Sequence, residues 1–267
     1  MMSFARKLVS TVIPLILVLG LCLVGCGPKA VDTSKLGLIE EGKLIIGSDC
    51  DYPPFIYMEG KNPAGFEVEL MQAIADDLGL ELVYLPPQNF DTLLTSVAGG
   101  GQMDLAVSSL TINDERKELV NFCRPYFNSN QAVVTRANSP YTKVEDLAGL
   151  KIGAQSGTTG EAWAIENLPT ATVKSYNQTS EGLAALRAGE IEALFFDEPV
   201  ATEQVATNFT DCQIIQVIPT GEQYGFAVSK DNPALEQAIN DSLQRLINNG
   251  TYAQIFSKYF DFDPTIK

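Results

Sequence analysis

The stretch Ser108-Ser109-Leu110-Thr111-Ile112-Asn113-Asp114-Glu115-Arg116 directly follows an apolar run, Leu105-Ala106-Val107. The apolar run has the composition of a buried parallel strand. In open α/β sheets, ligands bind beyond the carboxyl ends of the strands. Three hydroxyl groups and a guanidinium at that place are donors that suit a carboxylate. The stretch therefore predicts an α/β fold that binds a small organic acid.

Strands and helices alternate along the chain, and this order favours parallel, doubly wound sheets. In the first half, the pattern predicts strands at 44–47, 81–85 and 103–107, with helices at 66–78 and 92–98, the latter capped by Asp91. In the second half, it predicts strands at 132–134, 150–154, 173–176 and 193–196, with one helix from about Glu161 and another at 179–188 capped by Thr179 or Ser180. An apolar segment at 214–218 is expected to break at Thr220-Gly221, before a strand at 225–228 and helices around 235–246 and 252–259.

Composition excludes several classes of function. The chain has 267 residues, of which 45% are hydrophobic and 19% charged, as in a folded globular protein. The net charge of −15 argues against nucleic acid and anionic lipid as partners. There is no histidine, which removes Ser-His-Asp and Cys-His catalysis and the commonest zinc ligands. We expect no metal and no cofactor.

The amino terminus has the features of a secretory signal. Arg6 and Lys7 precede an apolar run, Leu8 to Val24, which is too short for a stable membrane span. The run ends in Leu23-Val24-Gly25-Cys26, which resembles a bacterial lipobox. We therefore expect a signal peptide at residues 1–25, lipidation of Cys26, and a flexible tether at 26–36. The protein would be extracytoplasmic and held at the bacterial cell membrane by this lipid anchor alone.

Three cysteines remain in the mature chain: Cys50, Cys123 and Cys212. The chain has no C-x-x-C motif, and an odd number of cysteines cannot pair completely. A disulfide between Cys50 and Cys123 is compatible with an extracytoplasmic compartment, and the sequence leaves it open.

Polar groups also follow three further strands. Ser48-Asp49 and Asp197-Glu198 each end an apolar run, and Gln155 to Gly160 is a Gly/Ser/Thr loop at a helix start, where backbone N–H groups favour anions. The loop lacks the lysine of a P-loop and the glycine spacing of a dinucleotide site. Each cluster alone is compatible with an ordinary turn or cap, but four in one doubly wound chain indicate a ligand site.

With these motifs, the chain resembles the extracytoplasmic solute-binding proteins of family 3, which deliver polar amino acids to ABC importers. The resemblance covers about Lys43 to Phe262. Its motifs are Gly47-Ser48-Asp49-Cys50-Asp51-Tyr52-Pro53-Pro54-Phe55, Gly65-Phe66-Glu67-Val68-Glu69-Leu70, the Ser108 to Arg116 stretch, Gln155 to Glu161, Phe196-Asp197-Glu198-Pro199 and Asn249-Gly250-Thr251-Tyr252. Phe122-Cys123-Arg124-Pro125-Tyr126 departs from the Phe-Ser-Asp-Pro-Tyr frequent in the family, which puts in doubt the hydrogen bonding near the hinge.

The resemblance implies a two-lobed periplasmic-binding-protein-like fold, with doubly wound sheets joined by two crossover strands. Residues 37–127 and 221–267 would form lobe 1, residues 132–217 lobe 2, and the hinge would lie near 128–131 and 218–220. The protein would be a monomer whose closed form is recognised by the membrane subunits of an ABC importer.

The resemblance also implies roles for individual residues. Arg116 would clamp the α-carboxylate of an amino acid, Thr158 and Thr159 would add donors, and Asp197 would accept the α-ammonium, assisted by Ser109. Tyr52 and Phe90 would flank the side chain, and Asp49 would lie at its end. The full set of expected ligand-binding residues is Asp49, Tyr52, Phe90, Ser108, Ser109, Thr111, Arg116, Gln155, Thr158, Thr159 and Asp197.

The negative charge of Asp49 favours a basic amino acid, because a buried carboxylate needs a charged or strongly donating partner. Arginine, lysine and ornithine supply a cation, and glutamine or another polar amino acid remains the alternative. The same fold can also support an enzyme, such as a dehydratase acting on a cyclohexadiene acid, or a sensor domain. We expect no enzyme, because the residues offer no general acid without a ligand-binding role already at hand.

Overall fold

The first of two five-stranded sheets has the order β5-β1-β6-β13-β7 in the computed structural model, which describes residues 32–264. Its strands are β1 (Lys43–Gly47), β5 (Glu81–Tyr84), β6 (Leu105–Ala106), β7 (Asn121–Phe122) and β13 (Ala227–Val228). β1 pairs in parallel with β5 and β6, whereas β13 pairs antiparallel with β6 and β7. The sheet is therefore mixed, and its antiparallel strand β13 is the one that the chain adds after it has returned from the second sheet.

Helices cover both faces of this sheet, as the strand pattern requires. Successive β1 side chains point to opposite faces. Leu44 and Ile46 therefore belong to the core with α1 (Phe66–Leu78), α7 (Pro233–Asn248) and α8 (Thr251–Phe256), while Ile45 packs with α2 (Phe90–Gly99). The helix predicted at 66–78 is confirmed, and Gly79 ends it in the left-handed conformation.

The second sheet has the order β10-β9-β11-β8-β12. Its strands are β8 (Phe127–Arg136), β9 (Lys151–Gln155), β10 (Thr172–Tyr176), β11 (Ala193–Asp197) and β12 (Cys212–Tyr224). The associated helices are α4 (Thr159–Asn167), α5 (Thr179–Ala188) and α6 (Glu198–Thr207), preceded by a 3-10 turn at Val144–Leu147. β9, β10 and β11 are parallel, and β8 and β12 run antiparallel to the strands beside them.

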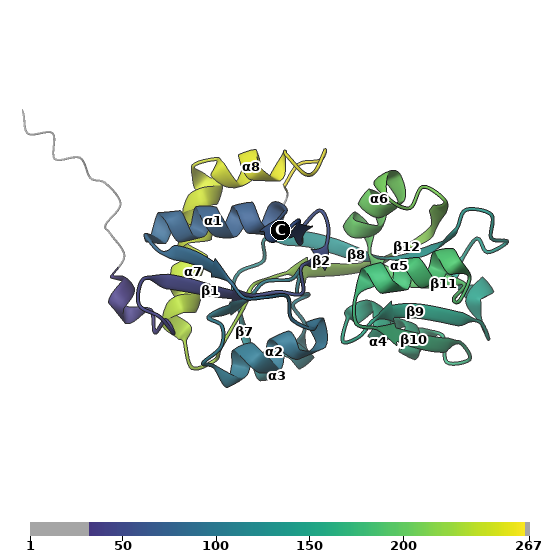
Figure 1. Cartoon of the computed structure of the whole chain (residues 1–267), viewed down its shortest axis with the longest axis horizontal. Helices are drawn as coiled ribbons and strands as arrows, with labels where there is room; N and C mark the ends of the chain where they lie inside the picture. Colours follow the sequence, from purple (N-terminus) through teal and green to yellow (C-terminus); the bar gives the residue numbers. More distant parts are fainter. Residues whose placement is uncertain (1–31, 265–267) are drawn as a thin grey trace, which may run out of the picture. The chain divides into compact units, whose positions relative to one another are not determined.

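Two long strands, β8 and β12, connect the sheets (Figure 1). Their antiparallel pairing runs from Cys212 opposite Arg136 to Tyr224 opposite Phe127, with a register shift between Ile218 and Glu222. The predicted break at Thr220-Gly221 was therefore wrong, since the strand absorbs the irregularity as a bulge and continues. This is the two-lobed, doubly wound fold that the sequence predicts. The hinge segments expected near 128–131 and 218–220 fall within these strands, and both the hinge and the exact lobe boundaries stay predictions.

Several local features differ from the sequence predictions. The helix expected at 92–98 begins at Phe90, after Asn89, so Asp91 lies in its first turn and does not cap it. The cap of α5 is Gln178, and Thr179 is its first helical residue. A small sheet of β2 (Asp51–Tyr52), β3 (Ile56–Glu59) and β4 (Asn62–Ala64), and the helices α3 (Asp114–Leu119) and α6, were not predicted. The small strands and α3 are too short to show periodicity, whereas α6 buries only Val200, Ala201 and Gln204 and so lacks a clear apolar stripe.

The expected signal peptide and the lipidation site Cys26 lie outside the described residues. The described end of the expected tether is not structureless: Thr33–Lys35 form a 3-10 turn, and Leu36 is buried against the core. Cys50, Cys123 and Cys212 are all buried and free, so the Cys50–Cys123 disulfide does not form here. No helix within residues 32–264 has the length and apolarity needed to cross a bilayer.

Candidate functional site

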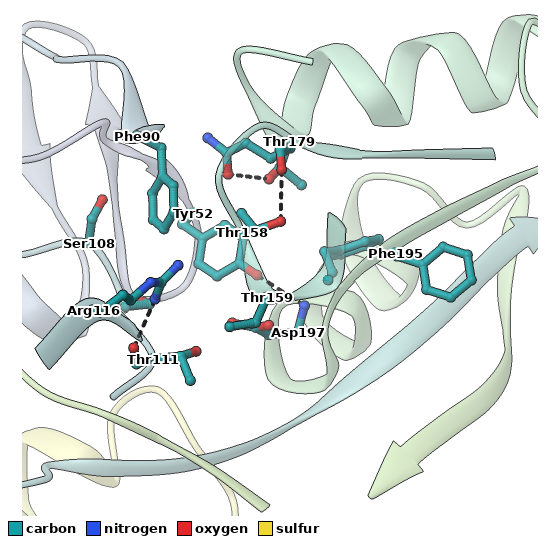
Figure 2. A pocket seen from close by; sticks show the side chains of 14 residues that line it. Tyr52, Phe90, Ser108, Thr111, Arg116, Thr158, Thr159, Thr179, Phe195 and Asp197 are labelled. Atoms are coloured by element: carbon teal, nitrogen blue, oxygen red, sulfur yellow. Dashed lines mark hydrogen bonds between the residues drawn. The ribbon is translucent and has the colours of Figure 1, made fainter. Parts of the chain in front are cut away.

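A cavity lies between the carboxyl ends of strands from both sheets. Figure 2 shows its walls, which include all the predicted ligand-binding residues except Asp49. The lining residues are Tyr52, Phe90, Ser108, Ser109, Thr111, Arg116, Gln155, Thr158, Thr159, Gly160, Thr179, Phe195, Phe196 and Asp197. Gly160, Thr179, Phe195 and Phe196 were not predicted. Thr179 stood out in the sequence only as a helix cap.

Arg116 is held in the cavity by its own short helix. Asn113 caps α3 by accepting a hydrogen bond from the Arg116 backbone N–H at 2.8 Å. Arg116 is 7% exposed, and its guanidinium donates to the Thr111 carbonyl at 2.9 Å and to the Gly157 carbonyl at 3.0 Å. The guanidinium carbon, Cζ of Arg116, lies 5.7 Å from the centre of the Phe90 ring. Since a guanidinium has five N–H groups, and these are its two hydrogen bonds to described residues, it retains donors for a ligand carboxylate.

The loop before α4 adds donors from the second sheet. The Thr158 side chain caps this helix by accepting from the Glu161 N–H at 3.1 Å, and it donates to the Gln155 carbonyl at 2.7 Å. Gly160 permits a close approach, because a Cβ there would lie 2.7 Å from Gln131 Oε1. The positive end of α4 and its first N–H groups therefore face the same cavity as Arg116, which suits an anion.

Asp197 ends β11 as a buried carboxyl group. It accepts hydrogen bonds from Tyr224 Oη and Gln131 Nε2, and its backbone N–H donates to Tyr52 Oη at 3.0 Å. Burial, together with the negative charge of Glu222, raises its pKa from 3.8 to about 7. An ammonium group beside it would restore the charged form, since an opposite charge lowers a carboxyl pKa.

Asp49 lies behind the cavity wall. Its carboxylate accepts from Ser108 Oγ at 2.5 Å and from Gln155 Nε2 at 2.8 Å, and the side chain is 2% exposed. Burial raises its pKa, although both hydrogen bonds act in the opposite direction. Ser108 and Gln155, and not the carboxylate itself, therefore form this part of the surface that a ligand would meet.

Glu67 is a second buried carboxyl group behind the site, and the sequence reasoning assigned it no role. It accepts from the Ser109 backbone N–H at 2.8 Å, from Ser109 Oγ at 3.0 Å and from Tyr126 Oη. Ser109 has a left-handed backbone (φ 49°), which is uncommon for a residue with a side chain. Glu67 thus holds Ser109 in the orientation in which it lines the cavity. The motif at 65–70 contains this glutamate but indicates only the start of a helix.

Glu222 and Gln131 complete the surroundings of Asp197 and were also missed. Both come from the crossover strands, where no motif marks them. No cluster of three or more cysteine, aspartate or glutamate side chains within residues 32–264 is arranged to hold a metal ion.

Comparison with known proteins agrees with this architecture. The model of the bacterial extracellular solute-binding proteins, family 3, matches residues 44–262. The chain belongs to this family. It is 33% identical to the L-cystine-binding protein TcyJ of Escherichia coli over 85% of each chain. It is 31% identical to the arginine-binding extracellular protein ArtP of Bacillus subtilis, over 82% of this chain and 86% of that protein.

Solved structures of the family share the fold. An ancestral arginine-binding protein bound to arginine superposes with a TM-score of 0.78 at 33% identity, covering 82% of this chain and 99% of the other. These three relatives are binding proteins and not enzymes, but the ligands in their names differ. Family membership therefore establishes solute binding, and the choice of solute depends on the site.

Proposed function

We propose that the protein binds an extracellular basic amino acid, namely arginine, lysine or ornithine, and delivers it to the membrane subunits of an ABC importer. The observation that carries this proposal is the placement of Arg116 and Asp197 on the walls of one cavity. A guanidinium suits a carboxylate and a carboxylate suits an ammonium, so the pair matches the two charges of an α-amino acid. Relatives named for arginine and for cystine support an amino acid as the ligand.

The charge around the cavity favours a cationic side chain. Asp49, Asp197 and Glu222 lie at or directly behind its walls, whereas Arg116 is the one cationic side chain among its lining residues. The carboxylate and ammonium of an α-amino acid cancel each other, so the negative excess remains. A second cation near Ser108, Gln155 and Asp49 would offset the cost of burying Asp49 in its charged form.

Two aromatic rings support the same assignment. Tyr52 and Phe90 line the cavity, and Phe90 already lies close to a guanidinium, that of Arg116. An aromatic face covers the methylene groups of a basic side chain and attracts its charged end.

Delivery would follow from closure of the lobes around the ligand. Hydrogen bonds already join them: Asp49 with Gln155, Arg116 with the Gly157 carbonyl, and Tyr52 with the Asp197 N–H. A ligand that contacts both lobes binds the closed form better than the open one, so it shifts the population toward closure. We propose that this closed monomer is what the importer reads, that Cys26 is lipidated, and that the protein has no catalytic activity.

Glutamine or another polar amino acid is the second candidate. Both oxygens of Asp49 already accept hydrogen bonds, from Ser108 and Gln155, and these neutral groups form the wall. A neutral amide side chain can bond to such a wall without a cation.

Isothermal titration calorimetry with the purified protein tests the proposal. The panel is arginine, lysine, ornithine, glutamine, histidine and cystine. We expect the tightest binding for a basic amino acid. Tight binding of glutamine or cystine with no response to the three basic amino acids would reject the proposed ligand, and binding of none would reject the amino-acid site itself.

A further inference from the structure

Several acceptors converge on one amide at the hinge side of the cavity. Gln131 Nε2 donates to Asp197 Oδ1, and it lies 3.2 Å from Thr159 Oγ1 and 3.2 Å from each carboxylate oxygen of Glu222. A side-chain amide has only two N–H groups. Gln131 is fully buried, and its own Oε1 has no hydrogen-bond partner among the described residues. This cluster therefore has fewer donors than its acceptors require.

Glu222 links the two lobes from the crossover strand β12. Its Oε2 accepts from Thr111 Oγ1 at 2.8 Å and from Thr159 Oγ1 at 3.1 Å. Thr111 follows β6 in the first lobe and forms a β-bridge with Tyr224, so it stays beside this part of β12. Thr159 begins α4 in the second lobe. Separation of the lobes would therefore keep the Thr111 bond and break the Thr159 bond.

Two carboxylates, those of Asp197 and Glu222, lie close to each other in this structure, with Gln131 Nε2 between them. Burial and the charge of Glu222 both disfavour the charged form of Asp197, and the charges of Asp197 and Glu222 both act on Arg116. Without another cation, closing the cleft costs electrostatic free energy. An α-ammonium supplies one positive charge and three N–H donors, which are what the cluster lacks.

We propose that Glu222 is a positioning residue that makes cleft closure depend on the α-ammonium of the ligand. It acts through Thr111 and Thr159, which line the cavity, and through the charge that it places beside Asp197. In the absence of a ligand, this charge disfavours closure, and in its presence the same charge strengthens it. The inference rests on the proposed binding of an α-amino acid.

The test compares L-arginine with 5-guanidinopentanoate, which has the same chain and carboxylate but no α-ammonium. Calorimetry gives the ratio of the two dissociation constants for wild type, Glu222→Gln and Glu222→Asp. The glutamine variant keeps an oxygen that can accept from both threonines but lacks the charge. We expect its preference for L-arginine over the analogue to fall by at least about tenfold, through weaker binding of L-arginine. Glu222→Asp keeps the charge and should keep most of the preference.

Small-angle X-ray scattering gives a second measurement, the radius of gyration, whose expected change a simple loss of packing would not produce. The radius of gyration of ligand-free Glu222→Gln should lie closer to the arginine-bound value than that of wild type does. Glu166→Gln, which removes an exposed carboxylate from α4, is the matched control and should behave as wild type.

An unchanged preference in Glu222→Gln would overturn the inference. If that variant does not fold, loss of the preference in a folded Glu222→Asp would overturn it as well. If wild type binds another amino acid in place of arginine, the comparison uses that amino acid and its des-amino analogue. A wrong solute and a wrong role for Glu222 therefore give different results.

Discussion

Replacing Asp197 with asparagine should have opposite effects on stability and on binding. The carboxyl is 7% exposed, and its pKa rises from 3.8 to about 7 on folding without ligand. A carboxyl whose folded-state pKa lies above its unfolded value binds its proton more tightly in the folded protein, so stability is lost as the pH rises from the unfolded pKa to the folded pKa. The corresponding destabilisation of the wild type is about 4 kcal/mol at pH 8 and about 2 kcal/mol at pH 5.

Asp197→Asn removes this titration. The ligand-free variant should therefore gain stability over wild type, with about 4 kcal/mol as the ceiling at pH 8 and a gain roughly 2–3 kcal/mol smaller at pH 5. If the amide of the variant cannot form one of the hydrogen bonds from Tyr224 or Gln131, the stability gain falls by the same amount at pH 5 and at pH 8. Binding of the amino acid at pH 8 should weaken by about 2 kcal/mol or more, since the ammonium loses its charged partner.

Urea unfolding at pH 5 and pH 8, with calorimetry at pH 8, measures both effects. Asp231→Asn, which changes an exposed carboxylate that is not among the cavity-lining residues, should alter neither. A stability difference between variant and wild type that does not grow from pH 5 to pH 8 would refute the reasoning about Asp197.

Four further predictions concern the site and its surroundings. Arg116→Ala should abolish binding of every amino acid in calorimetry. The charge-assisted pair is worth roughly 1.5–3 kcal/mol, and without it the ligand carboxylate would be buried with no charged partner. Binding at full strength would show that Arg116 does not hold the carboxylate. Asp49→Asn should shift the same panel from basic amino acids toward glutamine, and an unchanged order of affinities would contradict its role. Gly157→Ala should weaken binding, because φ is +76° at this position and the added Cβ would lie 3.0 Å from Asp91 Cα across the cleft. An affinity equal to that of wild type would show that the lobes close without this contact. Cys26→Ala should release the protein from membranes in cell fractionation, whereas retention in the membrane fraction would argue against lipidation.

The predictions of strands and helices depended on the local pattern of apolar residues, and they failed where that pattern was short or weak. Leu70, Ile74 and Leu78 repeat at helical spacing, and the helix they predict forms at 66–78. Thr220-Gly221 reads locally as a break, yet pairing with β8 on both sides keeps β12 continuous, with Glu222 opposite Ser129 beyond the shift. Hydrogen bonds to a partner strand thus override the local preference of two residues.

The sequence by itself determined that this protein is a doubly wound α/β protein with donors and carboxylates at its strand ends. Which of those residues share a site followed from the resemblance to family 3, because the residues come from two separate sheets and no local pattern brings their strand ends together. Only the tertiary structure decided that Asp49 lies behind Ser108 and Gln155, that Glu67 holds Ser109, and that Glu222 joins the lobes. Each of these depends on contacts between residues far apart in the chain, such as Asp49 and Gln155, 106 positions apart. The local sequence pattern cannot predict any one of these contacts, because each forms only when the two sheets and the two crossover strands pack together.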